Sequence, residues 1–191
     1  MAEKKKRYTT PIGFAKWAHL NTPKPPYKGD PDKDPKYMID VCFTVDNLEW
    51  RAWAQDLKAQ IDALPTQSNR QGETLKKQMP IKKEMGEDDQ PTGRFFATFK
   101  TGERFKPGVF DKYGKLLLEG ILIGNESKVR VSYVMSPYEG FGGGIALYLN
   151  AVQVLDLVEY KSQNAEAYGF TVEAEPVSAN SAPTPEDELP F

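Results

Sequence analysis

The chain has 191 residues, a length that suits one domain with a hydrophobic core and leaves room for insertions and a tail. It contains one cysteine, Cys42, and one histidine, His19, which excludes a disulfide framework and a multi-cysteine zinc site. The formal net charge of -2 hides an asymmetry. Residues 1–160 carry 24 basic and 21 acidic side chains, whereas residues 161–191 carry one basic and six acidic side chains.

The first third of the chain predicts two strands separated by a long loop. Residues 8–20 mix aromatic and β-branched residues with a proline and a glycine, which indicates a strand with an irregular start. Five prolines then fall within residues 21–36, which predicts a polar, proline-stiffened loop. Residues 36–46 alternate apolar and polar side chains with a period of two, so this strand should bury one face.

One helix follows the second predicted strand. Asp46 or Asn47 can cap it, its apolar residues recur from Leu48 to Leu64 at spacings of two to four, and Pro65 ends it. Residues 65–92 lose this apolar pattern and carry lysines beside carboxylates. They are interpreted as a mobile polar insertion, with at most a short helix.

The remaining segments predict strands only. These are residues 93–101, a short hairpin at 109–117, residues 127–136, and a long final strand at 144–160. Five or six strands with one helix after the second predict a mainly β protein. The count suits an OB-fold, a five-stranded Greek-key barrel, over residues 1–160.

The sequence predicts no catalytic residue, no metal site and no cofactor. His19 stands alone, and the glycines at 142–144 lack the Gly-Lys-Ser/Thr ending of a phosphate loop. The carboxylates of Glu87, Asp88 and Asp89 lie in the polar insertion, where a shaped, dry pocket for metal-assisted chemistry is not expected. A binding protein is therefore favoured over an enzyme.

Aromatic and basic residues stand close together on several predicted strands. Proteins that bind single-stranded nucleic acid need this combination. Their aromatic rings stack on the bases, while Lys and Arg neutralise the phosphate backbone. The candidate DNA-binding residues are Lys16, Trp17, Phe96, Lys100, Phe105, Lys106, Phe110, Lys112, Tyr113, Lys128, Arg130, Tyr138 and Phe141.

Alternation along the strands separates some of these candidates from the core. It places Lys128 and Arg130 on an outward face, and it makes Phe96 a stacking candidate while Phe95 and Phe99 face the core. Tyr138 and Phe141 lie in the glycine-rich connection between the last two strands, a loop that borders the binding face of such barrels. Pro137-Tyr138 is equally well explained as a packing corner.

The end of the chain combines acidic and apolar residues. Residues 161–191 are expected to form a flexible acidic tail, and its end is Glu186, Asp187, Glu188, Leu189, Pro190 and Phe191. An apolar end with an acidic collar suits a hydrophobic pocket with a basic rim. Such a tail can dock on a partner protein or lie in a cationic groove of its own chain.

Residues 121–160 resemble the closing segment of the single-stranded DNA-binding proteins of short-tailed bacteriophages. In that segment a glycine-containing turn leads to the run Ser-Lys-Val-Arg-Val-Ser-Tyr, then to a Pro-Tyr loop and to a long last strand that ends in Val-Glu. The acidic tail is similar to the tail of the same family, and its Pro-Phe end also resembles that of bacterial single-stranded DNA-binding proteins.

The resemblance implies an OB-fold that coats single-stranded DNA during phage replication, recombination and repair. It also implies a tail that masks the DNA groove and recruits phage or host replication proteins, and a tendency to form homodimers. We expect such a protein in the host cytoplasm, with no membrane partner, since no apolar run approaches the roughly 20 residues of a membrane span. Two alternatives stay open, an annealing or duplex-tolerant DNA-binding protein and a non-catalytic virion assembly protein.

Overall fold

The computed structural model describes residues 6–26, 33–118 and 120–160. The predicted tail and its six terminal residues lie outside the described residues, as does the middle of the proline-rich loop. No helix in the described part is long and apolar enough to cross a membrane.

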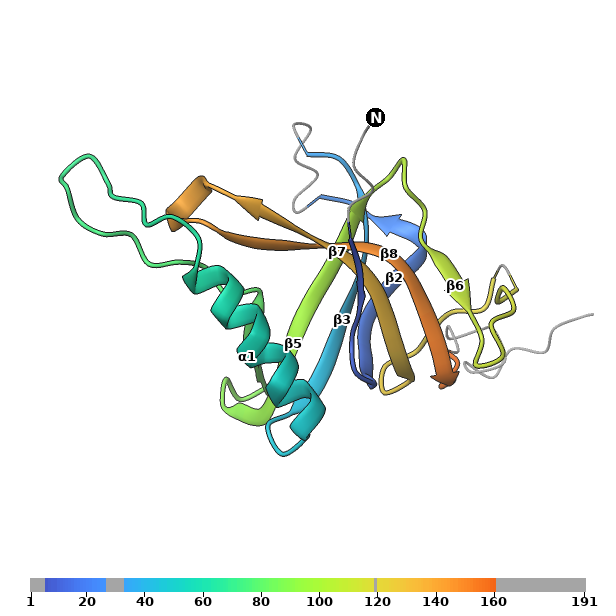
Figure 1. Cartoon of the computed structure of the whole chain (residues 1–191). Helices are drawn as coiled ribbons and strands as arrows, with labels where there is room; N and C mark the ends of the chain where they lie inside the picture. Colours follow the sequence, from blue (N-terminus) through green and yellow to red (C-terminus); the bar gives the residue numbers. More distant parts are fainter. Residues whose placement is uncertain (1–5, 27–32, 119, 161–191) are drawn as a thin grey trace, which may run out of the picture. The chain divides into compact units, whose positions relative to one another are not determined.

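The described segments form eight strands, one α-helix and a short 3-10 turn (Figure 1). The strands are β1 (Arg7–Thr9), β2 (Gly13–Lys24), β3 (Lys36–Thr44), β4 (Ile81–Met85), β5 (Pro91–Gly102), β6 (Gly108–Phe110), β7 (Lys128–Tyr138) and β8 (Gly144–Asp156). The helix α1 spans Leu48–Asp62, and the 3-10 turn η2 spans Gly140–Gly142.

Five of these strands close into a ring in the order β2-β3-β5-β8-β7, and β7 pairs again with β2. Every neighbouring pair in the ring is antiparallel except β5 and β8, which run parallel. This order is that of the OB-fold barrel. The predicted mainly β fold, a five-stranded barrel with one helix after its second strand, is therefore confirmed. The short strands β1, β4 and β6 extend the ring by pairing with β7, β5 and β8.

The period-two patterns point into the core as predicted. On β3 the side chains of Tyr37, Ile39, Val41 and Phe43 are buried, with Val129, Val131 and Tyr133 on β7 and Ala97 and Phe99 on β5. All of these residues except Tyr37 belong to one hydrophobic cluster that also contains residues of α1. The barrel and the helix therefore share a single core.

Helix α1 forms because its first turn is capped and one of its faces is apolar. The side-chain oxygen of Asn47 accepts hydrogen bonds from the backbone N–H groups of Glu49 (3.1 Å) and Trp50 (3.2 Å). The Trp50 ring stacks on Phe43 at 4.2 Å between centroids, and its Nε1 donates to the Ile12 carbonyl at 2.7 Å. Trp53 Nε1 donates to the hydroxyl of Tyr133 on β7 at 2.7 Å. The helix thus contacts β3, β7 and the residue that precedes β2.

Two sequence predictions about loops are wrong. The segment 65–92 is not entirely a loop, because it includes all of β4 and the first residues of β5. The sequence pattern did not predict β4, because a charged residue occupies a buried position there. Glu84 is buried through contacts with Lys16 and Arg94, and this breaks the period-two alternation of apolar and polar residues. The loop predicted at 21–36 is also shorter, because β2 continues to Lys24 and β3 begins at Lys36.

We expect Trp50→Ala to lower the free energy of unfolding by about 3 to 5 kcal/mol, because it empties a fully buried site and removes a partly buried hydrogen bond. Urea denaturation followed by circular dichroism measures this loss. Trp17→Ala is the matched control, since the Trp17 ring is 57% exposed and its removal should cost less than about 1 kcal/mol. Equal losses from the two variants would show that α1 does not anchor the core.

Candidate nucleic-acid interface

A groove of about 680 Å³ lies along the seam where β5 meets β8. Its walls are residues 78–80 and 82, residues 98 and 100–102 of β5, residues 145–148 of β8, and the side chains of Lys36, Tyr138 and Phe141. The only register pair between β5 and β8 in the described part of the chain, Lys100 with Tyr148, lies in this groove. The groove therefore opens where the ring is joined by the least backbone pairing.

Three lysines give the groove its positive charge. Lys36, Lys82 and Lys100 come from three different strands. Partial burial lowers the pKa of Lys100, the charges of Lys36 and Lys82 lower it further, and Asp40 acts against this change. Three ammonium groups that repel one another are a favourable place for an anion such as a phosphate, whose charge offsets the repulsion.

Aromatic rings of β7, β8 and the turn between them also line the groove. Phe141 is 90% exposed, Tyr148 is 48% exposed and Tyr138 is 39% exposed. The backbone of Phe141 has φ 54° and ψ 38°, the left-handed region that a bulky residue rarely adopts. Residues with a strained backbone of this kind concentrate at functional sites. The groove thus offers stacking planes beside cations.

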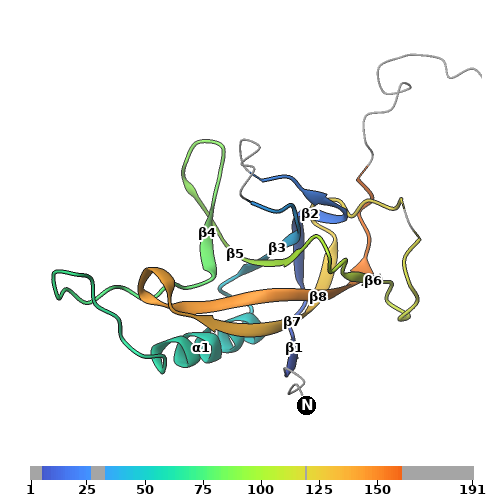
Figure 2. The same cartoon turned by 90° about the horizontal axis from the view of Figure 1, so that it is seen from above.

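The loop that carries Phe141 is tied to the segment that follows α1. Gln78 donates from its backbone to the Gly143 carbonyl at 2.8 Å and from its side chain to the Phe141 carbonyl at 3.3 Å. Lys77 donates its ammonium to the carbonyls of Asp62 (2.6 Å) and Leu64 (2.5 Å) at the end of α1. Figures 1 and 2 both show the β7–β8 end beside this connection. The groove wall is therefore fixed to the helix.

Comparisons with known proteins give a consistent result. No protein-family model and no curated protein matches the chain. Among solved structures, gp2.5, a single-stranded DNA-binding protein of bacteriophage T7, matches with a TM-score of 0.58 and 18% identity over 92% of this chain and 100% of that chain. The single-stranded DNA-binding protein of bacteriophage Enc34, solved in complex with single-stranded DNA, matches with a TM-score of 0.58 and 20% identity, covering 82% and 89%.

The fold is that of phage single-stranded DNA-binding proteins. The resemblance predicted from residues 121–160 is confirmed at this level. In this OB-fold, the face made by the second and third strands of the ring, β3 and β5, and the loop between its last two strands are the usual ligand-binding parts. The groove of this chain is lined by residues of both parts, among them Lys36 and Lys100 of β3 and β5 and Phe141 of that loop.

The outer face of β3 and β5 continues from the groove as a network of charged residues. Lys16 contacts Glu84 at 2.5 Å, and Arg94 Nε lies 3.5 Å from the same carboxylate. Burial alone would raise the pKa of Glu84, but hydrogen bonds from Lys16 and Thr92 and the charge of Arg94 bring the pKa below its ordinary value. Glu84 therefore stays ionised and neutralises part of this face.

Asp40 and Cys42 lie on β3 in the same face. Burial raises the pKa of Asp40, against the effects of a hydrogen bond from Thr98 Oγ1 (2.7 Å) and of nearby lysines. Burial also raises the pKa of Cys42 to about 11, with a further contribution from the Glu84 charge. Cys42 is 0% exposed, as expected of a small core residue rather than a reactive thiol.

The structure brings only part of the predicted site together. Lys100, Tyr138 and Phe141 line the groove, and Lys16 and Phe96 lie on the adjoining face of β2 and β5. Phe110 and Arg130 line a different hollow, of about 280 Å³, beside β6, β7 and β8. The other candidates lie outside the groove: Trp17 in an irregular part of β2, Phe105 and Lys106 between β5 and β6, Lys112 and Tyr113 in the hairpin after β6, and Lys128 at the start of β7.

Sequence reasoning missed three residues that line the groove, Lys36, Lys82 and Tyr148. Tyr148 could have been found, because it alternates with the buried Leu147 and Leu149 and must therefore face outward. Lys36 and Lys82 carried no such signal. Lys36 stood at the end of the proline-rich loop, and Lys82 stood in the segment interpreted as a solvated insertion.

We expect Gly142→Ala to displace the loop that carries Phe141. Gly142 has φ +92°, and a Cβ there would lie 2.4 Å from the Lys76 carbonyl oxygen. The left-handed backbone alone costs about 1 to 2 kcal/mol for alanine. Limited proteolysis should therefore cut residues 66–78 faster in this variant, and urea unfolding should show a stability loss. Gly140→Ala is the control, because its Cβ meets no atom within 4 Å; the same effect there would contradict the tethering.

Proposed function

We propose that this protein binds single-stranded DNA in the groove between β5 and β8, largely without sequence preference and without covalent chemistry. The observation that carries the proposal is the meeting of Lys36, Lys82 and Lys100 with the exposed rings of Tyr148 and Phe141 in one groove. The relative from bacteriophage Enc34, whose structure holds single-stranded DNA, supports it through the shared fold.

Single strands suit this groove better than a duplex does. Bases of a single strand are free to stack on aromatic rings, each for about 1 to 3 kcal/mol, whereas a duplex keeps its bases stacked inside. The three lysines come from different strands, so they can follow a bent backbone along the seam. Because any base offers a ring face, such stacking does not depend on sequence.

The proposal includes a biological setting. We infer a role in coating DNA during phage replication, recombination and repair in the host cytoplasm. The acidic tail would mask the groove when DNA is absent and recruit replication proteins, and the chain would form homodimers. The excess of carboxylates after residue 160 and the mildly basic remainder of the chain support masking, since tethering keeps the local concentration of the tail high.

We expect Tyr148→Ala and Phe141→Ala each to weaken single-strand binding by about 1 to 3 kcal/mol, or roughly five- to 150-fold. Fluorescence anisotropy with a labelled oligothymidine measures the dissociation constant. Tyr113→Ala is the matched control: its ring is 76% exposed but lies in the hairpin after β6, so its removal should leave the affinity within about two-fold.

The same titration separates the alternatives. Equal affinity for the labelled strand and its duplex would favour an annealing or duplex-tolerant protein. Absence of salt-sensitive DNA binding would overturn the proposal and favour a virion assembly protein.

We expect Lys100→Ala to lower the salt dependence of binding as well as the affinity. Each phosphate neutralised on a single strand contributes about 0.7 to the slope of log K against log salt. Anisotropy titrations between low and moderate salt should therefore give a slope smaller by about that amount. Lys112→Ala should leave the slope unchanged, because Lys112 lies in the hairpin after β6, away from the groove walls. A loss of slope in both variants would mean that the strand also contacts this hairpin.

A further inference from the structure

Strand β2 contains one residue more than its pairing with β3 requires. Lys16 pairs with Asp40 and His19 pairs with Met38, so three steps along β2 correspond to two steps along β3. The extra residue makes a β-bulge, a feature that redirects a side chain and is common beside functional sites. Within the bulge the backbone of Trp17 has φ 51°, in the left-handed region that a bulky residue rarely adopts.

The bulge turns Trp17 outward without disturbing the core. Ala15 and Leu20 are buried and Ala18 packs against the core cluster, so inward positions continue on both sides of the bulge. The Trp17 side chain is 57% exposed. A bend alone would be served best by glycine, which adopts a positive φ at no steric cost. The shape of the barrel therefore explains the bulge but not the indole ring that it carries.

The turn before β7 holds this bulge in place. The side-chain oxygen of Asn125 accepts a hydrogen bond from the backbone N–H of Trp17 at 3.1 Å. The next residue, Glu126, also has a positive φ, of 70°, and its backbone N–H donates to the Ala15 carbonyl at 2.9 Å. Two strained residues thus lie on segments that hydrogen bonds join. Such strain persists only where the surrounding structure enforces it, and it concentrates at ligand sites.

Two cations stand beside the indole, and both are paired. Lys16 Nζ lies 5.9 Å from the centre of the Trp17 ring. Among the described residues, the carboxylate partner of Lys16 is Glu84, and Arg94 contacts both Glu84 and Glu126. Two carboxylates therefore balance the two cations. The bulge adds a stacking plane to the outer face of the sheet but almost no net positive charge.

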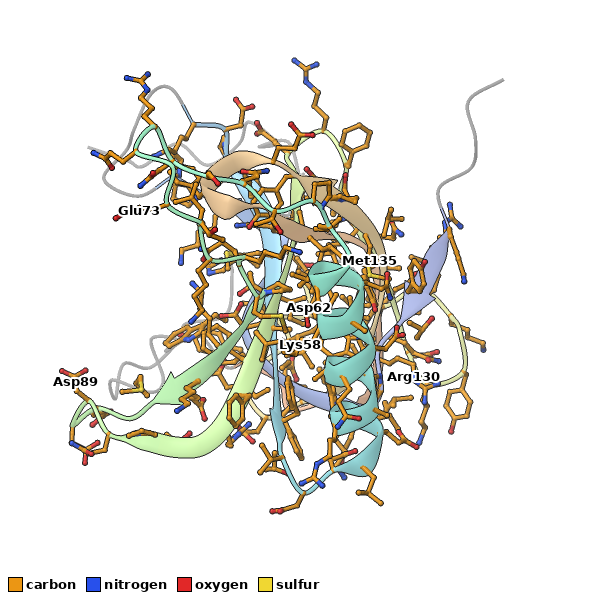
Figure 3. The ribbon with its side chains drawn as sticks, turned by 60° about the vertical axis from the view of Figure 1, so that its left-hand side comes forward. Lys58, Asp62, Glu73, Asp89, Arg130 and Met135 are labelled. Atoms are coloured by element: carbon orange, nitrogen blue, oxygen red, sulfur yellow. The ribbon has the colours of Figure 1, made fainter. Side chains whose placement is uncertain are left out.

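The bulge lies two strands away from the groove. Lys16 of β2 is opposite Asp40 of β3, which is opposite Thr98 of β5, and Thr98 lines the groove. Two strand spacings are about 10 Å. A single strand that fills the groove can extend this far, since one OB-fold covers about 4 to 16 nucleotides. Arg130, by contrast, lies on the side of α1 away from the β4–β5 hairpin (Figure 3).

We propose that Trp17 is a second stacking platform, which takes a base of the same single strand whose phosphates the groove lysines bind. The inference rests on the proposed function and deepens it, because it assigns a contact beyond the groove walls. Any base can stack on the ring, so the platform does not select a sequence. Because the neighbouring cations are paired, the platform stabilises binding through stacking and not through phosphate neutralisation.

Trp17→Gly in the full chain tests the platform, because glycine suits the left-handed backbone and removes only the ring. This variant should unfold at about the same urea concentration as the native protein. Its affinity for an oligothymidine of about 16 nucleotides should fall roughly five- to 150-fold. Its affinity for one of about four nucleotides, which fills the groove alone, should stay within about two-fold. The salt dependence of binding should not change, in contrast to that of Lys100→Ala.

Indole fluorescence gives a second measurement, because a stacked base quenches it. Of the three tryptophans, Trp17 is exposed, whereas Trp50 is fully buried and Trp53 packs against the core. The longer oligothymidine should quench the native protein. Trp17→Phe should lose this quenching but keep most of the affinity, since it retains a ring. Tyr113→Ala is the matched control and should change neither, because Tyr113 also has a lysine, Lys112, 5.1 Å from its ring but lies in the hairpin after β6.

Four outcomes would overturn the platform. Binding of the longer strand that neither quenches the native protein nor weakens in Trp17→Gly would overturn it and leave the groove proposal standing. An equal loss for the two oligonucleotides would place Trp17 inside the first site. A clear loss of stability in Trp17→Gly would show that the indole is kept for packing. Absence of binding by either oligonucleotide would overturn the proposed function together with this inference.

Discussion

The groove depends on how the barrel closes between β5 and β8. Nine register pairs join β3 to β5 and eleven join β7 to β8, but a single parallel pair, Lys100 with Tyr148, joins β5 to β8 in the described part of the chain. Where two strands diverge after one pair, side chains rather than a backbone ladder must line the gap. The ring is thus complete enough to enclose a core and open enough to hold a ligand at its seam.

The segment between α1 and β4 keeps this seam open in a defined shape. Lys77 binds the carbonyls at the end of α1, which also favour a cation through the helix dipole, and Gln78 binds the loop that carries Phe141. The helix is in turn held by the stacking of Trp50 on Phe43 in the core. A groove built on such supports loses little conformational entropy when a ligand binds.

Local patterns predicted most of the fold, while the site depends on contacts between distant residues. Alternation identified β3, β5 and β7, and the cap at Asn47 located α1, because these signals lie within one element. It missed β4, where burial of Glu84 depends on Lys16 and Arg94 from two other strands. Adjacent cations and aromatic rings suggested Phe110 and Tyr113 as well as Lys100. Only the order of strands around the barrel separates them.

The buried thiol of Cys42 can report how often the outer face of β3 becomes exposed. Burial raises the pKa of this thiol to about 11 and also blocks access to it, so the reactive thiolate is scarce at pH 7. Folded chains should therefore not cross-link through oxidation, and any dimer between them is non-covalent. Cys42 lies on the outer face of β3, with its Sγ 3.9 Å from Glu84 Oε1 of β4, so the rate of its alkylation measures how often the side chains that cover this face move aside.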